Sequence, residues 1–351
     1  MNIKTANDRI KAGLLLPDIF SLLGDLWQAG ELAILFGGTG SGKSILGVQI
    51  GDGLSNGENV WYELKNENPP LIVLYMDFEL SDKQFQVRYT SDDKKSTYQF
   101  SDNFKMVNIP FGEIYEPGKN ITAKIFELIE KCLEETEAKV LIIDNLTALS
   151  TEDNKDGNVA MEIMSYLDKL KRKNGYSILV IGHTPKKFEF TPLTNGDLAG
   201  SSKITQFADA VFALGKSVID NDFRYLKPTK NSRSKKETYH SNNVITIKKI
   251  KETNFLKFEY EGTTTEDEHL SKNGDDKKLQ AIAMRNQGLP IRTIAEKLGL
   301  SVGTISNYTK NEKNLKPFER NEQNEHSEQI EQSEQNEHGE QLERNEQKTP
   351  F

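Results

Sequence analysis

One segment constrains this chain more than any other: Gly37-Gly38-Thr39-Gly40-Ser41-Gly42-Lys43-Ser44 fits the pattern G-x-x-x-x-G-K-[ST] in full. Glycines at these positions let main-chain N–H groups turn inward around phosphate oxygens, which larger side chains would prevent. An apolar, strand-like run (ELAILF) precedes the segment, and a helical pattern (SILGVQI) follows it. This order predicts a strand, a phosphate-binding loop and a helix, in that sequence.

The last two residues of the segment carry the specific chemistry. Lys43 is expected to supply a positive charge to the β- and γ-phosphates, and the Ser44 hydroxyl is expected to ligate Mg²⁺. The helix that opens at Ser44 adds the partial positive charge of its N-terminus. The predicted cofactors are therefore ATP and Mg²⁺. The alternative is a flexible glycine-rich turn that contains an incidental Lys-Ser pair.

Short apolar runs alternate with helical patterns through the first 260 residues. Unbroken apolar runs separated by helices are typical of a parallel sheet covered on both faces, so the predicted fold class is α/β. Alternation from Val244 to Tyr260 predicts an antiparallel hairpin that closes the sheet. The expected strands are Leu32–Phe36, Leu71–Met76, Val140–Ile143, Ile178–Ile181 and Ala210–Leu214, and the expected helices are Ser44–Leu54, Asp82–Tyr89, Ile121–Glu135 and Val159–Lys173.

Polar side chains follow three of the predicted strands, and such strands end at the ligand-binding edge of the sheet. Asp144 ends the run LIID, the pattern of a Walker B motif, and is expected to hold Mg²⁺ through its water shell. Glu79 is expected to be the base that activates the attacking water, with Asp77 as the fallback. His183 is expected to contact the γ-phosphate. The plainer interpretations are a turn cap for Asp144, a helix N-terminal acid for Glu79 or Asp77, and a surface position without a role for His183.

A second pattern lies in residues 277–316, which we interpret as a helix-turn-helix DNA-binding domain. Predicted helices at Lys277–Asn286, Ile291–Leu298 and Val302–Lys310 are separated by Gly288-Leu289-Pro290 and Gly299-Leu300-Ser301. Ala295 would let two helices approach closely, and Gly299 would permit a left-handed turn between them.

The charge of this region favours a nucleic-acid partner. Residues 271–316 carry nine basic and four acidic side chains, a balance of +5 in a chain of net charge −8. Short polar groups on the second helix could meet base edges, while cations neutralise phosphates. The alternative is a helical hairpin used for protein contacts. The candidate DNA-binding residues are Arg292, Ser301, Thr304, Ser306, Asn307 and Lys310.

The remaining segments complete a division into four parts: an ATPase domain over 1–260, a linker over 261–276, the DNA-binding domain, and a tail over 317–351. The linker is polar and lacks apolar periodicity. From Asn321 the tail consists of nine triplets with Glu in the middle, a period that fits neither helix nor strand. It is expected to be disordered, with an interaction tail as the alternative.

Composition excludes several classes of protein. No run approaches the roughly 18 apolar residues of a membrane helix, and the first 13 residues lack the apolar centre of a signal peptide. With Cys132 as the single cysteine, neither an intramolecular disulfide nor a cysteine-cluster metal site can form. The expectation is a soluble, cytoplasmic protein without a membrane partner.

The order of the motifs resembles that of the RecA-like P-loop ATPases, and most of all the RepA-type helicase and mobile-element AAA ATPase group. The similarity covers about Leu26–Leu214 and rests on GGTGSGKS, MDFELSDKQFQVR, LIIDNLTAL, VIGHTPK and LAGSS followed by ADAV. It implies a RecA-like core with Glu79 as the catalytic base and His183 as the γ-phosphate contact. It also implies a homo-oligomer, as a ring or filament, whose loops after the Walker B strand and after His183 line a DNA channel.

Two features depart from that family. The first channel loop, Ser150–Asn158, is acidic, which suits a phosphate backbone poorly. Family members also present a Lys and an Arg, one residue apart, to the nucleotide of the neighbouring subunit. The nearest candidates for this trans finger are Lys230 and Arg233, whose spacing differs. The helix-turn-helix resembles that of site-specific recombinases and transposon-associated proteins.

The sequence thus predicts a Mg²⁺-dependent ATPase that acts on DNA, as a RepA-type helicase or DNA-remodelling motor of a plasmid or mobile element. A second hypothesis is a DNA-bound regulator or replication initiator in which ATP is a conformational switch and no unwinding occurs. The acidic first loop favours the second hypothesis. A small-molecule kinase is disfavoured, because the sequence has no obvious phosphoacceptor-binding loop.

Overall fold

The computed structural model describes residues 3–16, 18–109, 121–145, 158–184, 190–198, 201–232, 237–270 and 274–310. The chain divides into two compact units, Met1–Asn273 and Gly274–Phe351, which are treated separately below. Among the described helices, none combines the length and hydropathy of a membrane span. The predicted tail over 317–351 and residues 150–157 of the predicted first channel loop lie outside the described residues.

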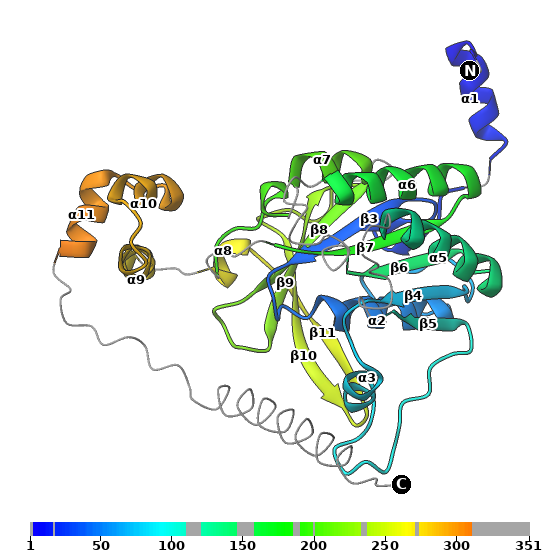
Figure 1. The fold of residues 1–351 in the computed structure, drawn as a ribbon, viewed down its shortest axis with the longest axis horizontal. Helices are drawn as coiled ribbons and strands as arrows, with labels where there is room; N and C mark the ends of the chain where they lie inside the picture. The colour runs from blue at the N-terminus through cyan, green and yellow to red at the C-terminus, as the bar shows by residue number, and fades with distance from the viewer. Residues whose placement is uncertain are drawn as a thin grey trace, which may run out of the picture. The chain divides into compact units, whose positions relative to one another are not determined.

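A nine-stranded sheet forms the centre of the first unit (Figure 1). Its order is β11-β10-β9-β8-β3-β7-β6-β4-β5, and β8 through β5 in this order run parallel, whereas β9, β10 and β11 are antiparallel. This confirms the predicted α/β class with a mainly parallel sheet. The strands are β3 (Leu32–Gly37), β4 (Val73–Asp77), β5 (Phe104–Asn108), β6 (Val140–Asp144), β7 (Ser177–His183), β8 (Ala210–Lys216), β9 (Phe223–Lys230), β10 (Val244–Glu252) and β11 (Phe255–Thr264).

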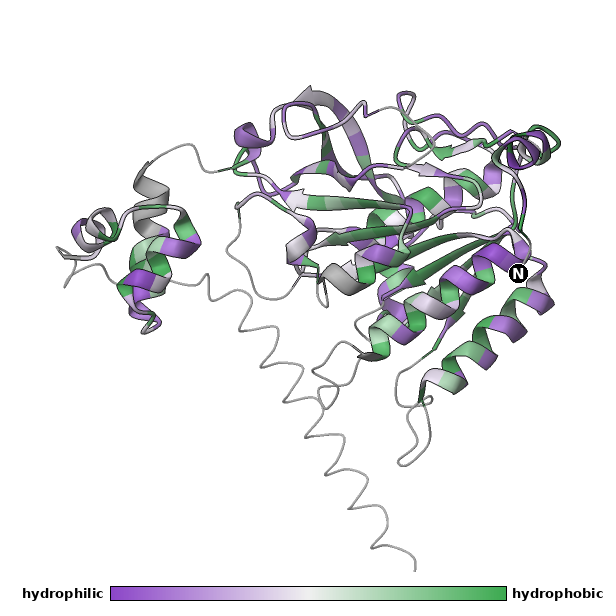
Figure 2. Cartoon of the chain, turned by 90° about the horizontal axis from the view of Figure 1, so that it is seen from above, coloured by the Kyte–Doolittle hydropathy of each residue, from purple (hydrophilic) through white to green (hydrophobic). Residues whose placement is uncertain are grey.

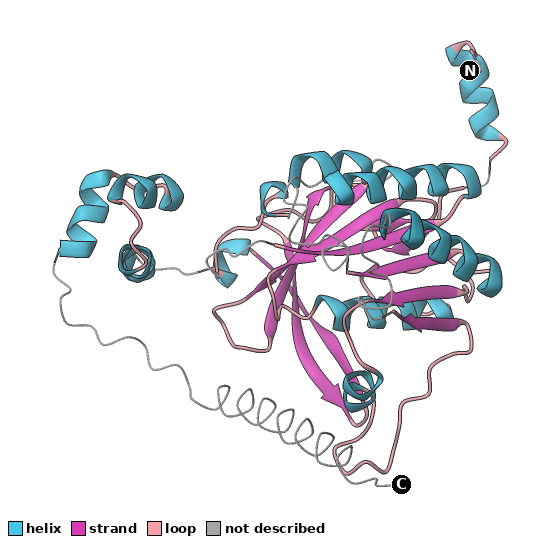
Figure 3. Cartoon of the chain, viewed as in Figure 1, coloured by secondary structure: helices cyan, strands magenta, loops and turns pink. Residues whose placement is uncertain are grey.

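Helices cover both faces of the parallel strands (Figure 3). Leu32, Ile34 and Phe36 of β3 join the core under α5 (Ile121–Thr136), α6 (Asn158–Asn174) and α7 (Ser201–Phe207), whereas Ala33 and Leu35 join the core around α2 (Lys43–Asn56). Successive strand residues point to opposite faces, so both sets must be apolar. The strands are accordingly hydrophobic along their length, while the helices carry one polar face (Figure 2).

The helix that follows the phosphate loop is enclosed from two sides. Lys43 and every residue from Ile45 to Ser55 of α2 are buried. The hairpin of β10 and β11 provides the second side, where the Gln49 amide exchanges two hydrogen bonds of 2.9 Å with the backbone of Phe258. The predicted hairpin over Val244–Tyr260 therefore exists, and it packs against α2.

The predicted linker over 261–276 is wrong for its first ten residues. Strand β11 continues to Thr264, and α8 (Glu266–His269) folds back onto the sheet. Glu266 forms a buried ion pair of 2.6 Å with Lys227, and buried His269 lies 2.8 Å from the Ser217 hydroxyl and stacks on Tyr225. In the interior, these polar side chains form their hydrogen bonds and ion pairs with one another. A polar sequence of this kind is indistinguishable from that of an exposed linker.

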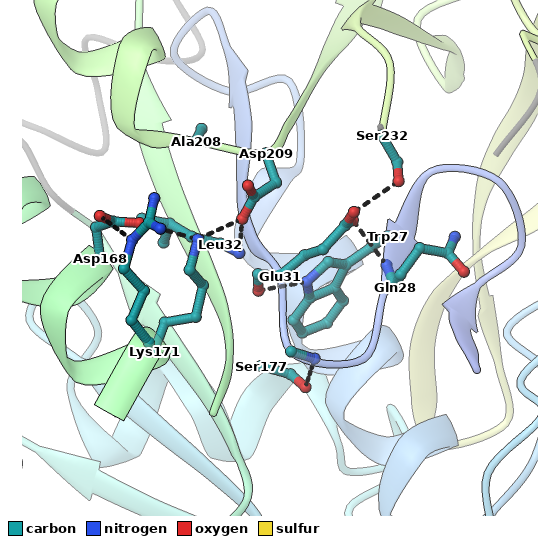
Figure 4. A network of polar contacts seen from close by, with 12 residues as sticks. Trp27, Gln28, Glu31, Leu32, Asp168, Lys171, Ser177, Ala208, Asp209 and Ser232 are labelled. Atoms are coloured by element: carbon teal, nitrogen blue, oxygen red, sulfur yellow. Dashed lines mark hydrogen bonds and ion pairs between the residues drawn. The ribbon is translucent and has the colours of Figure 1, made fainter. Parts of the chain in front are cut away.

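Polar contacts secure the sheet at the edge where β3 begins (Figure 4). Asp209 accepts hydrogen bonds from the Leu32 amide at 3.0 Å and from Lys171 of α6 at 2.6 Å. The Gly30 amide donates to the Ser177 hydroxyl at 2.9 Å, at the start of β7. These contacts align the starts of β3, β7 and β8, so the carboxyl ends of the same strands also lie level.

Several smaller elements complete the unit. Helix α3 begins with the predicted capping box, in which Ser81 and Gln84 each bond the other's backbone amide. Helix α1 contains no buried residue. The bounds are α1 (Ala6–Leu14), β1 (Ser21–Leu23), β2 (Trp27–Gln28), α3 (Asp82–Arg88) and η2 (Asn195–Asp197).

Where the structure describes the second unit, over residues 274–310, three helices contact one another: α9 (Gly274–Asn286), α10 (Ile291–Leu298) and α11 (Val302–Lys310). Gly299 ends α10 with a left-handed φ of 60°, as expected for the turn. The described core of this unit consists of Ala281, Ile282, Met284, Ile294, Ala295, Leu298 and Ile305.

Candidate nucleotide site

The predicted catalytic and phosphate-binding residues meet at one edge of the sheet. Pairing places Gly37 beside His183 and Asp77 beside Asp144 at the carboxyl ends of their strands. The Phe78 amide donates to the Asp144 carbonyl at 2.8 Å, which holds the turn that carries Glu79 against β6. The sheet therefore brings the phosphate loop and all three polar strand ends together.

The loop over Gly37–Ser44 depends on glycine where its neighbours come close. Gly42 has a φ of 97°, and a Cβ there would lie 2.6 Å from the Phe258 ring. A Cβ on Gly37 would lie 2.3 Å from the Leu214 carbonyl oxygen. A side chain at either position would force the loop away from the sheet, so the compact form of the cradle requires these glycines.

Lys43 occupies the cradle from within. Its Nζ donates to the carbonyls of Gly37 and Gly38 at 3.0 Å each and lies 3.2 Å from His183 Nδ1. Burial lowers the pKa of Lys43 to about 8, although the nearby carboxylates of Asp144 and Glu79 oppose the shift. The ammonium is therefore held by weak carbonyl acceptors that phosphate oxygens could replace.

Glu79 lies in a polar cluster with Asn145 and His183. The Asn145 amide nitrogen donates to Glu79 Oε2 at 2.6 Å and lies 2.9 Å from His183 Nε2, which is itself 3.7 Å from Glu79 Oε2. Contact with His183 lowers the pKa of the Glu79 carboxyl, and Asn145 and Lys43 add to the effect. With half of its side chain exposed, Glu79 is an ionised acceptor that water can reach.

Asp144 has the chemistry expected of a residue that helps to hold a metal. Its carboxylate is 1 % exposed, and the Tyr75 hydroxyl donates to Oδ2 at 2.7 Å. Within the described residues, Oδ1 is buried and has no hydrogen-bond partner. Burial raises the pKa of Asp144, and the Tyr75 and Ser44 hydroxyls oppose this shift. A carboxylate oxygen without a partner, near the Ser44 hydroxyl, fits a hydrated Mg²⁺.

Asp77, the fallback base, is used to shape the turn. Its Oδ1 accepts the backbone amides of Glu79 and Leu80 at 2.9 Å each, and the residue is 3 % exposed. Burial raises the pKa of its carboxyl. Asp77 therefore positions Glu79, and the geometry favours Glu79 over Asp77 as the base.

Sequence reasoning missed four residues of this site: Tyr75, Asn145, Lys216 and Arg224. Asn145 directly follows Asp144, so its place beside the Walker B carboxylate was a signal that could have been used. Tyr75 is the aromatic residue of β4, whose other residues before Asp77 are Val, Leu and Met. Lys216 of β8 has its Nζ 4.0 Å from the Cβ position of Gly40, and Arg224 of β9 donates to the Ser41 carbonyl. No local sequence pattern points to either residue.

Lys230, a candidate for the trans finger, bonds to carbonyl groups of its own chain. Lys230 donates to the carbonyl of Thr205 at 2.8 Å and to that of Ala208, near the C-terminal end of α7. A lysine that satisfies helix-terminal carbonyls of its own chain is poorly placed to reach another subunit's nucleotide. Arg233 lies outside the described residues.

The predicted DNA-binding residues differ in exposure. Arg292 and Asn307 are exposed, whereas Thr304 and Ser306 are half-buried. Exposed Ser301 accepts the Thr304 amide at 3.0 Å, so it caps α11. Lys310 is the last residue of α11.

The sequence model of the AAA domain family matches residues 8–189, more than half of the chain. The chain belongs to this family. The match spans the phosphate loop, Glu79, Asp144 and His183, and it supports a P-loop ATPase. Among solved structures, the AAA ATPase is similar to a KaiC-like protein from the hyperthermophilic archaeon Pyrococcus horikoshii, with 17 % identity and a TM-score of 0.44. That similarity covers 66 % of this chain and 91 % of the archaeal chain. No curated protein matches the sequence.

Proposed function

We propose that this AAA ATPase hydrolyses ATP with Mg²⁺ and uses the energy to move along or remodel DNA, in the manner of a RepA-type helicase. The observation that supports hydrolysis most directly is the cluster of Glu79, Asn145 and His183 beside the Lys43 ammonium. It offers a cation for the phosphates and an ionised base for water within one hydrogen-bonded group.

The chain's own residues suggest how the site works. Lys43 would leave the carbonyls of Gly37 and Gly38 for the β- and γ-phosphates, and His183 would contact the γ-phosphate. Glu79 would accept the proton of the attacking water while Asn145 keeps the carboxylate in place. Ser44, with Asp144 through the water shell, would hold Mg²⁺, which neutralises phosphate charge when bound.

The DNA part of the proposal rests on the second unit. Residues 271–316 are basic within an acidic chain, and Arg292 and Asn307 are exposed on consecutive helices. Exposed cations provide the salt-dependent part of DNA affinity, and exposed short polar groups can contact bases. A homo-oligomer, as a ring or filament, would let several such units hold one DNA molecule.

The test is the steady-state ATPase rate with and without single- and double-stranded DNA, together with the solution mass in the presence of nucleotide. We expect DNA to raise the rate, a mass above that of the monomer, and no activity in Lys43→Ala. Absence of hydrolysis in the wild type would overturn the ATPase proposal. If the protein hydrolyses ATP but does not bind DNA, and DNA does not raise its rate, the DNA part alone is overturned.

The acidic composition of Ser150–Asn158 favours a second candidate, a DNA-bound regulator or replication initiator that uses ATP as a switch. An acidic loop would repel a DNA strand threaded past it. A strand-displacement assay separates the two proposals. A motor would displace the labelled strand in an ATP-dependent manner, whereas a switch would bind DNA, hydrolyse slowly and displace nothing.

A further inference from the structure

Arg224 joins the antiparallel part of the sheet to the phosphate loop. It lies on β9 and is 5 % exposed. Its Nε donates to the Ser41 carbonyl at 2.8 Å, and Nη2 lies 3.5 Å from the Gly40 carbonyl. Its Nη1 donates to the carbonyls of Asn221 and Phe223 at 2.6 and 2.7 Å. One guanidinium therefore ties the loop to the turn between β8 and β9.

These contacts determine which way the loop's peptide groups face. The C=O and N–H of a trans peptide point in opposite directions, so a Ser41 carbonyl held toward Arg224 turns the Gly42 amide away from it. Lys43 holds the carbonyls of Gly37 and Gly38 in the same manner on the other limb of the loop. Lys43 would move to the phosphates when nucleotide binds, whereas Arg224 can keep its carbonyls throughout.

We propose that Arg224 is a positioning residue for the triphosphate: it holds the loop with the amides presented to the phosphates before nucleotide arrives. Preorganisation of this kind raises affinity, because the loop is already ordered in the free protein and loses less conformational entropy when nucleotide binds. A guanidinium suits the task because its planar fork can serve several acceptors at once and it stays charged when buried. The inference rests on the proposed nucleotide binding and adds a strand outside the parallel core to that site.

The test compares ATP affinity, kcat and KM for Arg224→Met and Arg224→Lys with the wild type. We expect Arg224→Met to weaken ATP binding about tenfold, since it leaves the loop carbonyls without their charged donor. KM should rise in proportion, and kcat should change less than about twofold. This is the pattern expected when the lost interaction stabilises the bound substrate and the transition state equally. Arg224→Lys should fall between the two, because an ammonium keeps the charge but lacks the planar fork that reaches the loop and the β8–β9 turn together.

Lys227→Met is the matched control. Lys227 is also a buried cation of β9, but its partner is Glu266 of α8. It should lower the melting temperature and leave ATP affinity within about twofold of the wild type at a temperature where all variants are folded.

Three outcomes would count against the inference. Wild-type affinity in Arg224→Met overturns it, and so does an equal loss of affinity in Lys227→Met. If Arg224→Met does not fold, wild-type affinity in Arg224→Lys overturns it. Failure of the wild type itself to bind ATP would instead overturn the proposed function, which the Lys43→Ala comparison detects separately.

Discussion

At the scale of single residues, the nucleotide site is a balance between buried charges. Lys43 Nζ lies 3.2 Å from His183 Nδ1, and the other ring nitrogen of His183 lies 2.9 Å from the Asn145 amide nitrogen, which donates to Glu79. A change at one of these side chains therefore alters the hydrogen bonding of the next. Two predictions follow from this chain of contacts.

Glu79→Gln should bind ATP and lose turnover. The amide retains the size of the carboxylate and can still contact Asn145, but it cannot accept a proton from water. Loss of a general base typically costs about 10²- to 10⁴-fold in rate. Single-turnover phosphate release and equilibrium ATP binding should be measured on the same preparation. Turnover at the wild-type rate would show that Glu79 is not the base.

ATP affinity should fall as the pH rises above about 8, the pKa of buried Lys43. The ammonium is needed for the phosphates, and above its pKa the free site must take up a proton to bind. Affinity should then drop about tenfold per pH unit between pH 8 and 9.5. Lys43→Arg keeps its charge over this range, so its affinity, whatever its value at pH 7, should show no such slope. A flat wild-type profile contradicts the expectation.

At the scale of elements, α2 determines how closely the phosphate loop approaches the sheet. Glycines on this helix allow the contact: a Cβ on Gly51 would lie 2.4 Å from the Phe104 ring of β5. An aromatic ring in a packed core cannot move aside without displacing its own neighbours. On the side that faces β5, the helix therefore has room only for small residues.

Gly51→Ala should destabilise the first unit by about 1–3 kcal/mol, the usual cost of overpacking, even though alanine favours helix. Gly13→Ala is the control, because Gly13 of α1 has no atom within 4 Å of its Cβ position. Urea unfolding followed by tryptophan fluorescence should show the loss in the first variant only. Equal stability of both variants would mean that Phe104 yields at no cost.

Elements with a strong local pattern could be predicted from sequence, and those defined by distant partners could not. The apolar runs that became β3, β4, β6, β7 and β8, and the capping box of α3, carry their signal within a few residues. Because parallel strands share one ligand edge, the meeting of Lys43, Glu79, Asp144 and His183 was predictable as well. Strands β5 and β9 mix polar and apolar residues, so neither had such a signal.

The errors have one physical cause. Arg224, Lys227, Glu266 and His269 are polar residues that are buried against partners 39 to 183 positions away. In the sequence they look like residues for solvent, which is why 261–270 resembled a linker and Lys230 resembled a free cation. Burial of a polar group depends on its partner, and a single sequence does not identify that partner.

At the scale of the whole molecule, an acidic ATPase unit is followed by a helical region, residues 271–316, whose side chains carry a net positive charge. If the second unit supplies the contacts to DNA phosphates, DNA affinity should fall steeply with salt, as counterion release requires. A chain that ends after Leu270 should keep its DNA-independent ATPase rate and lose DNA binding. Fluorescence anisotropy on labelled duplex between 50 and 200 mM salt would measure both effects. Full DNA affinity in the shortened chain would place the contacts elsewhere.

The enclosure of α2 between the sheet and the β10–β11 hairpin has a consequence for local opening. Amide protons exchange with solvent only when their segment opens, and a helix buried on both sides can open only if a whole layer detaches. We therefore expect the amides from Leu46 to Leu54 to be among the slowest in the first unit to take up deuterium. Helix α2 would then stay folded and packed while nucleotide binds to and leaves the loop at its N-terminal end.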